Sequence, residues 1–133
     1  MQQYPQACDH KQADIEPKDV NLVEVHDATS FCEIYQLEML GFCEVGSGGK
    51  FVEEGHTKLG GRLPVNLSGG LVSKGHPVGA TGLSMVHELA IQLKGNAGNR
   101  QSERNKIGLA ENGGGVIGFE EAACSVIILE ASS

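Results

Sequence analysis

The distribution of glycine constrains the fold of this chain more than any other feature of its sequence. All 19 glycines of the 133 residues lie between Gly41 and Gly118, and they make up about twice the usual share of a globular protein. They follow no three-residue period and only 4 prolines accompany them, which excludes a collagen-like chain. Since 40% of the residues are apolar, we expect one folded domain whose tight turns and ligand-contacting loops hold the glycines.

Charge and cysteine content exclude several classes of protein. Acidic residues outnumber basic ones by 17 to 10 and no Lys/Arg cluster exists, which argues against a nucleic-acid partner. Apolar runs fall far short of the ~18 residues that span a bilayer, so we expect no membrane span. The 4 cysteines form no CxxC pair and the 5 histidines are scattered. We therefore expect reduced thiols, no metal site and a cytoplasmic protein, or a peroxisomal or mitochondrial one in a eukaryote.

The hydrophobic pattern of the first half predicts a strand, a polar turn and a helix. Residues 20–25 are mostly apolar and rich in valine, which is typical of a buried strand. Ser30 and Glu33 form a capping box, which predicts a helix that ends at Gly41. Residues 43–63 show no periodicity and are expected to form a long loop. The expected apolar face of the helix consists of Phe31, Ile34, Tyr35 and Leu37.

The second half predicts another helix and further strands, which gives an α/β layered fold. Apolar residues at three- and four-residue spacing predict a helix that is closed by Gly95. Its expected apolar face consists of Leu83, Val86, Ala90 and Leu93. The remaining expected elements are a short strand over 65–68, a strand over 106–110, a turn over 111–115, a return strand over 116–119 and a central strand over 124–129.

Two histidines at turns before helices are the candidate chemical groups. His26 directly follows the buried strand, and the carboxyl ends of strands are where sites form in α/β sheets. His76 lies between Gly75 and Pro77 in a glycine-rich loop that leads into a helix. An oriented imidazole nitrogen can polarise a carbonyl oxygen or accept a thiol proton. A turn histidine bonded to nearby backbone explains each position as well, so the residues alone leave both interpretations open.

Two short glycine motifs do not support a nucleotide cofactor. Residues 113–118 match the G-x-G-x-x-G pattern, but the segment after them is too short for the rest of a dinucleotide fold. Residues 46–50 resemble part of a phosphate-binding loop, but Phe51 stands where Ser or Thr would bind magnesium. We therefore expect no bound cofactor.

One long loop resembles a loop of the thiolase family. Residues 66–82, which read NLSGGLVSKGHPVGATG, resemble the glycine-histidine-proline loop of thiolases. Residues 23–28, which read VEVHDA, are similar to the histidine-aspartate form of a second thiolase loop, found in the sterol-carrier-protein (lipid-transfer) branch. Residues 95–101 and 108–115 are also similar to that branch. The resemblance runs from about residue 14 to the C-terminus in the family's order.

The resemblance implies a fold and a set of partners. It implies the C-terminal half of the thiolase-like fold, a mixed α/β sheet with helices on its faces within an αβαβα layered architecture. Residues 1–133 would form this domain, with the half's first strand and the nucleophile-bearing N-terminal half absent. The implied partners are that missing half and an acyl-CoA thioester, which is a substrate rather than a cofactor. A half that exposes its packing face is also expected to form a homo-oligomer.

The resemblance also implies roles for the histidines. In thiolases a cysteine of the N-terminal half attacks the acyl-CoA thioester. His76 would activate that cysteine and bind the thioester oxygen, and His26 would stabilise the enolate-like oxygen of the second acyl group. The implied substrate-binding residues are Asn66, Gly75, Pro77, Gly79, Gly114 and Gly115.

The sequence departs from the thiolase pattern at both positions of the second catalytic cysteine. Ala28 follows His26-Asp27 where the branch has cysteine, and Glu111 precedes Asn112 at the other position. The first implied function is that of a C-terminal domain of an acyl-CoA C-acyltransferase, of the acetyl-CoA acetyltransferase type, in lipid metabolism. The alternatives are a thiolase-fold retro-aldolase subunit for CoA-linked side chains and a non-catalytic acyl-CoA-binding or scaffold module. The isolated chain is expected to be inactive as a thiolase.

Overall fold

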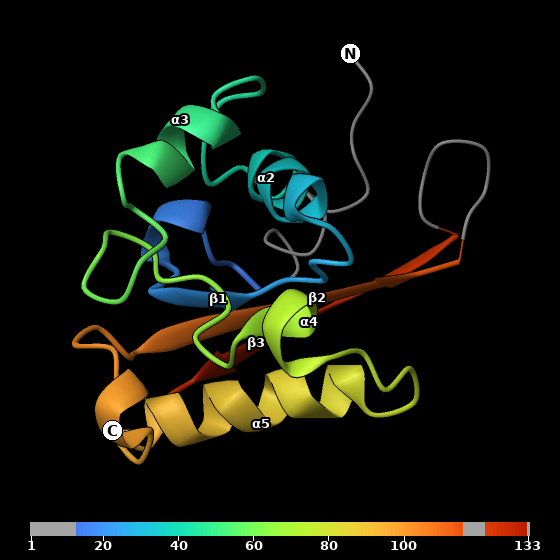
Figure 1. Cartoon of the computed structure of the whole chain (residues 1–133). Helices are drawn as coiled ribbons and strands as arrows, with labels where there is room; N and C mark the ends of the chain where they lie inside the picture. Colours follow the sequence, from blue (N-terminus) through green and yellow to red (C-terminus); the bar gives the residue numbers. More distant parts are fainter. Residues whose placement is uncertain (1–12, 116–121, 133) are drawn as a thin grey trace.

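Helices cover both faces of a three-stranded sheet (Figure 1). The computed structural model describes residues 13–115 and 122–132. One face of the sheet carries helices α2 (Ser30–Met39) and α3 (Gly48–Glu53), and the other carries α5 (Thr81–Leu93). The short helix α4 (Gly70–Lys74) lies beside the sheet, and its Leu71 packs in the same core as α5. Short 3-10 helices lie at η1 (Pro17–Asp19) and η2 (Gly98–Arg100). The expected α/β layering with helices on both faces is confirmed.

The sheet is mixed, with strand order β1-β2-β3. Strand β1 (Leu22–Glu24) pairs in parallel with β2 (Ile107–Gly114), and β2 pairs antiparallel with β3 (Ala123–Glu130). Beyond β1, Val23 and Val65 form an isolated parallel bridge. The short strand expected over 65–68 is therefore a single bridging residue.

Two apolar cores lie on the two faces of the sheet. Because successive side chains of β1 point to opposite faces, Leu22 packs toward α5 and Val23 toward α2. Burial on both faces explains the apolar run at residues 20–25. The α2 core contains Val20, Val23, Val25, Leu37, Leu40, Phe42, Phe51, Leu63, Val65 and Leu109. The α5 core contains Leu22, Leu71, Met85, Leu89 and Ala110.

Helix α2 differs from the sequence prediction in its cap and in its buried face. The N-cap is Thr29, whose hydroxyl accepts a hydrogen bond from the Cys32 backbone N–H, so the predicted Ser30 capping box is wrong by one residue. Phe31 is 69% exposed and stacks on Tyr35, with their ring centroids 6.1 Å apart. Of the predicted face Leu37 is confirmed as buried, and the helix buries it together with Gln36 and Met39. Its predicted end is confirmed, because Gly41 adopts φ +78° directly after the last turn.

The segment 43–63, predicted to be a loop, contains helix α3. Phe51 packs into the α2 core, and the Gly48 backbone N–H donates to Glu38 Oε1 at 2.8 Å. A helix of 6 residues is too short to produce a visible apolar period.

Helix α5 also buries a different face from the one predicted. It begins at Thr81, and Leu83 is 74% exposed. Helical spacing of the apolar residues fits more than one stripe, and packing against β2 selects the stripe. The buried side consists of Thr81, Met85, Glu88, Leu89 and Gln92.

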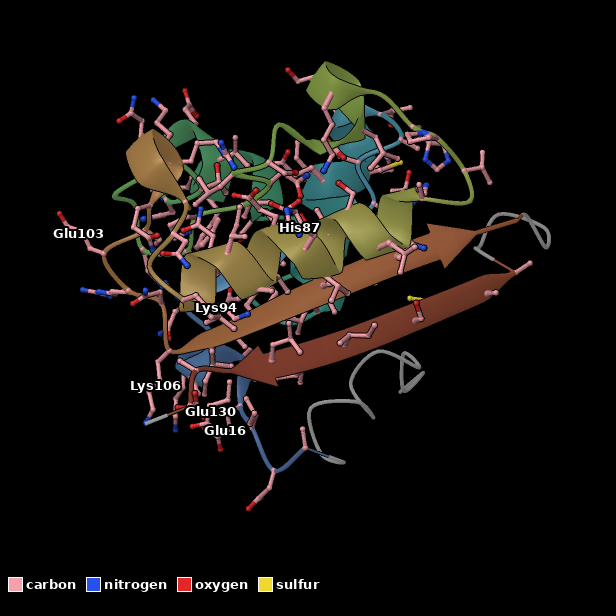
Figure 2. The ribbon with its side chains drawn as sticks, turned by 90° about the horizontal axis from the view of Figure 1, so that it is seen from below. Glu16, His87, Lys94, Glu103, Lys106 and Glu130 are labelled. Atoms are coloured by element: carbon pink, nitrogen blue, oxygen red, sulfur yellow. The ribbon has the colours of Figure 1, made fainter. Side chains whose placement is uncertain are left out.

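The C-terminal strands correct two further predictions. Residues 111–114 continue β2 instead of turning, since Glu111 pairs with Val126 and Gly114 with Ala123. Pairing with β3 thus overrides the low strand propensity of the glycines. Figure 2 shows β3 next to β2 at one edge of the sheet. Among the described strands it is therefore an edge strand and not the predicted central one. The return strand predicted over 116–119 lies outside the described residues.

Candidate active site

The structure brings the two candidate histidines into contact. His26 follows β1 and His76 follows α4, and their ring centroids are 4.9 Å apart at an interplanar angle of 88°. The loop after α4 lies against the carboxyl end of β1, and this places the two rings side by side. Two adjacent imidazoles can act on two oxygens of one small substrate.

The ring of His26 is oriented by strand β2. His26 Nδ1 lies 3.0 Å from the side-chain oxygen of Asn112. Because an amide oxygen only accepts hydrogen bonds, Nδ1 carries the hydrogen and Nε2 is the free position of the neutral ring. The backbone N–H of His26 donates to Oε2 of the buried Glu111 at 3.0 Å. Strand β2 therefore holds both the backbone and the ring of His26.

The ring of His76 is oriented by the first residue of α5. His76 Nδ1 lies 2.7 Å from the hydroxyl of Thr81, and that hydroxyl donates to the carbonyl of Pro77 at 3.2 Å. Since a hydroxyl has one hydrogen, the Thr81 oxygen accepts from His76 Nδ1–H. The lone pair of the neutral ring is then at Nε2. This nitrogen can accept a proton from a nucleophile and afterwards donate it as a hydrogen bond.

A buried carboxylate connects the two histidine loops. Asp27, adjacent to His26, is 4% exposed, and its Oδ1 accepts from the backbone N–H of Leu71 at 2.7 Å. Its Oδ2 lies 3.5 Å from the N–H of Val72, so the carboxylate caps the start of α4. Gly70 adopts φ +61°, and a β-carbon there would collide with this carboxylate. The helix that leads to His76 is thus held by the residue next to His26.

The predicted substrate-binding residues fall into three places. Asn66 fixes the chain just after β1, because its side-chain oxygen accepts a hydrogen bond from the Val25 N–H at 2.8 Å. Its buried Nδ2 has no hydrogen-bond partner within the described residues. The loop residues at 75, 77 and 79 are exposed beside His76. Gly114 and Gly115 are exposed at the end of β2, just beyond Asn112. Their contact with substrate stays a prediction.

Comparison with known proteins places this arrangement in a family. The family profile described as "Thiolase C-terminal domain-like" matches residues 5–130. The chain belongs to this thiolase family. It is 49% identical over 108 residues to an acetyl-CoA acetyltransferase of Methanothermobacter thermautotrophicus, covering 81% of this chain and 28% of the relative. It is 44% identical over 123 residues to sterol carrier protein 2 of Bos taurus, a match that covers 86% of this chain and 23% of that relative.

A solved structure shares the thiolase-type fold of this domain. The Ltp2-ChsH2(DUF35) aldolase superposes with a TM-score of 0.77 and 25% sequence identity, covering 92% of this chain and 29% of that one. The chain therefore spans about a quarter of the length of these relatives. The expected C-terminal half of the thiolase-like fold is confirmed.

Neither Cys32 nor Cys124 occupies an expected cysteine position in the sequence, but Cys124 contacts the residue at one of them, Glu111. Cys32 lies one turn into α2, with its sulfur 3.2 Å from the Thr29 hydroxyl. The thiol of Cys124 donates to Glu111 Oε1 at 3.3 Å, so a carboxylate and a thiol adjoin the backbone of His26. Within residues 13–115 and 122–132 no group of His, Cys, Asp or Glu side chains could hold a metal ion. No helix of this same part is long and apolar enough to cross a membrane.

Sequence reasoning missed the residues that orient the histidines. Asn112 was assigned to a turn because glycines follow it, and Thr81 lay just before the predicted helix. A signal for Thr81 was present, since a hydroxyl in the first turn after a histidine loop can reach back to the ring. Asp27 was part of the histidine-aspartate resemblance, but its partners could not be read from local sequence because they lie 44 and 45 residues away.

Proposed function

We propose that this domain contributes the two histidine loops of a thiolase-like acyl-CoA C-acyltransferase, of the acetyl-CoA acetyltransferase type. An N-terminal half that carries the nucleophilic cysteine, outside residues 1–133, completes the enzyme. The observation that carries this proposal is the contact of the two oriented rings, with 4.9 Å between their centroids. The similarity to an acetyl-CoA acetyltransferase and to sterol carrier protein 2 supports acyl-CoA as the substrate class and lipid metabolism as the setting.

In the proposed first half-reaction, His76 acts as general base. Its Nε2 accepts the thiol proton of the N-terminal cysteine while the sulfur bonds to the thioester carbon. The ring then carries hydrogens on both nitrogens. Nδ1–H continues to donate a hydrogen bond to the Thr81 hydroxyl oxygen, and Nε2–H donates one to the oxyanion. Collapse of the intermediate expels coenzyme A as a thiolate, which takes this proton and leaves an acyl-cysteine.

In the proposed second half-reaction, His26 stabilises the enolate oxygen of the second acyl-CoA. For this step Nε2 first takes up a proton from solvent, so that Nδ1–H stays hydrogen-bonded to Asn112 and Nε2–H donates to that oxygen. The α-carbon must lose a proton, and thiolases use a second cysteine for this step. Ala28 and Glu111 stand at the two family positions, and of these two only the Glu111 carboxylate can accept the proton.

A retro-aldol reaction is the second candidate, and the similarity to the Ltp2-ChsH2(DUF35) aldolase favours it. In that reaction the hydroxyl of a 3-hydroxyacyl-CoA loses its proton and the bond between the α- and β-carbons breaks. The products are a carbonyl compound and the enolate of the shortened acyl-CoA, which is then protonated. This chemistry needs an enolate-stabilising pair but no second thiolase cysteine to remove an α-proton, which fits the residues at 28 and 111.

Reconstitution with an N-terminal half distinguishes these functions. The full chain would be combined with the N-terminal half of the similar archaeal acetyltransferase and assayed for acetoacetyl-CoA thiolysis. His76→Ala should lower the rate by about 10²–10⁴-fold, the usual effect of losing a general acid-base group. His87→Ala, an exposed histidine on α5 (Figure 2), is the matched control and should leave the rate unchanged.

Each other outcome has a clear meaning. Cleavage of a branched 3-hydroxyacyl-CoA without thiolysis would replace the acyltransferase by the aldolase. Tight coenzyme A binding without turnover of either substrate would contradict both and leave a binding module.

A further inference from the structure

A buried carboxylate on β1 begins a chain of side-chain hydrogen bonds that reaches the loop of His76. Glu24 is 2% exposed. Its Oε2 accepts from the Ser68 hydroxyl at 2.5 Å, and its Oε1 accepts from the Ser68 backbone N–H at 3.1 Å. Because the single hydroxyl hydrogen of Ser68 is directed to Glu24, the Ser68 oxygen is left to accept from another donor.

Two donors use this oxygen: the backbone N–H of Gly70 at 3.2 Å and the side chain of Lys74, the last residue of α4. Its Nζ donates to Ser68 Oγ at 2.8 Å and to Ser84 Oγ, on α5, at 2.6 Å. Lys74 directly precedes Gly75-His76. The ammonium group therefore joins the segment before α4 to α5, and the loop of residues 75–80 lies between these two attachment points.

We propose that Glu24 is a positioning residue that acts through Ser68 and Lys74 to hold the loop carrying His76. The catalytic importance of this role rests on the proposed function of His76. The position of the loop itself can be measured without any acyl transfer.

The charges around Glu24 make this chain of contacts sensitive to pH. Burial raises the pKa of Glu24 to about 7, against the lowering effect of the Ser68 hydrogen bonds. Lys74 of α4 lowers this pKa and Glu88 of α5 raises it, while Arg100 pairs with Glu88 at 2.9 Å. An ionised Glu24 is a stronger acceptor for Ser68 and attracts the ammonium group of Lys74. The loop is therefore held more tightly above pH 7 than below it.

Nuclear magnetic resonance of the labelled full chain tests this role. Backbone amide relaxation of residues 75–80 and the ring signals of His76 would be followed between pH 5.5 and 8.5. In the wild type the loop should become more ordered as pH rises, with a midpoint near 7 in the amide shift of Ser68. Glu24→Gln should remove this transition and leave the loop as mobile as it is at low pH.

Lys74→Met provides a second variant that does not risk the core, because Lys74 is exposed. It should make the loop mobile at every pH, whereas Lys94→Met, an exposed lysine at the end of α5 (Figure 2), should behave like the wild type. Unchanged loop order in Lys74→Met would overturn the proposal, even if Glu24→Gln failed to fold. The proposal would also be overturned if a folded Glu24→Gln variant kept the pH transition in loop order. Absence of acyl transfer in the reconstituted enzyme would contradict the proposed function alone, since the readout here is loop order.

Discussion

At the scale of single residues, each histidine depends on one neutral hydrogen-bond partner. Asn112 and Thr81 set which ring nitrogen carries the hydrogen, and thereby which one faces a substrate. This orientation is independent of any charge on the partner. The partners can therefore be changed without altering the net charge of the site.

Substitution of Thr81 tests this orientation. Thr81→Val keeps the shape but removes the acceptor for His76 Nδ1–H, so the ring should lose its single tautomer. Nitrogen chemical shifts of the ring would then report a mixture of Nδ1–H and Nε2–H forms, and thiolysis by the reconstituted enzyme should fall about tenfold or more. Thr81→Ser retains the hydroxyl and is the control. A single tautomer in Thr81→Val would show that another group orients the ring.

Substitution of Glu24 should change how stability depends on pH. The pKa of Glu24 rises from 4.5 to about 7 on folding, so the folded chain holds this proton more tightly than the unfolded chain. The resulting stabilisation is complete below pH 4.5 and is lost as pH rises toward 7, which amounts to about 3 kcal/mol of unfolding free energy. Urea unfolding of the wild type and of Glu24→Gln should therefore diverge between pH 5 and 8. A constant difference between the two curves would contradict this assignment.

At the scale of elements, local patterns predicted which segments fold but not how they face each other. The apolar run at 20–25 and the helix before Gly95 were recognisable because burial imposes a period. The stripe of α5 that is buried was not, since Leu83 fits a helical period yet is 74% exposed. Helix α3 was missed because its 6 residues are stabilised by contacts with α2 rather than by their own pattern.

In the candidate site, too, the sequence indicated the individual residues but not how they pack against each other. Both histidines were found from the sequence because each lies at a turn before a helix. The thiolase resemblance assigns both to one active site, but local spacing does not show their contact, because the bond that orients His26 joins it to Asn112, 86 positions away. Long-range pairing of this kind leaves no trace in local spacing.

A glycine at the start of α4 tests how the two loops are joined. Gly70→Ala would combine an unfavourable φ of +61° with a β-carbon against the Asp27 carboxylate. We expect a loss of at least about 2 kcal/mol in urea unfolding, from backbone strain together with displacement of the carboxylate. Gly49→Ala, in α3 and with open space around it, is the matched control and should be neutral or stabilising by up to about 1 kcal/mol. Equal effects at the two positions would contradict the role of Asp27.

At the scale of the whole molecule, the surface around His76 carries exposed apolar side chains. Val72, Val78 and Leu83 are 66%, 80% and 74% exposed; Val72 precedes the loop of residues 75–80, Val78 lies in it and Leu83 follows it. The chain spans about a quarter of the length of its relatives. An apolar surface beside a candidate active site is the kind of surface that another part of an enzyme covers.

The isolated chain should therefore self-associate through this surface. Sedimentation velocity over a range of concentrations should reveal dimers or larger species, and Leu83→Gln should shift the distribution toward monomer. Leu59→Gln, at a residue that is 48% exposed in the segment after α3, is the control and should have little effect. A monodisperse monomer at high concentration would contradict this prediction.

The central claim is that His76 acts as the general base for a nucleophilic cysteine that lies outside residues 1–133. Rapid-quench measurement of coenzyme A release from acetyl-CoA tests it most directly. The reconstituted enzyme should release a burst of one coenzyme A per active site, and His76→Ala should slow that burst by about 10²–10⁴-fold. Neither half alone should produce a burst. A burst from this chain by itself, or an unchanged burst in His76→Ala, would contradict the account.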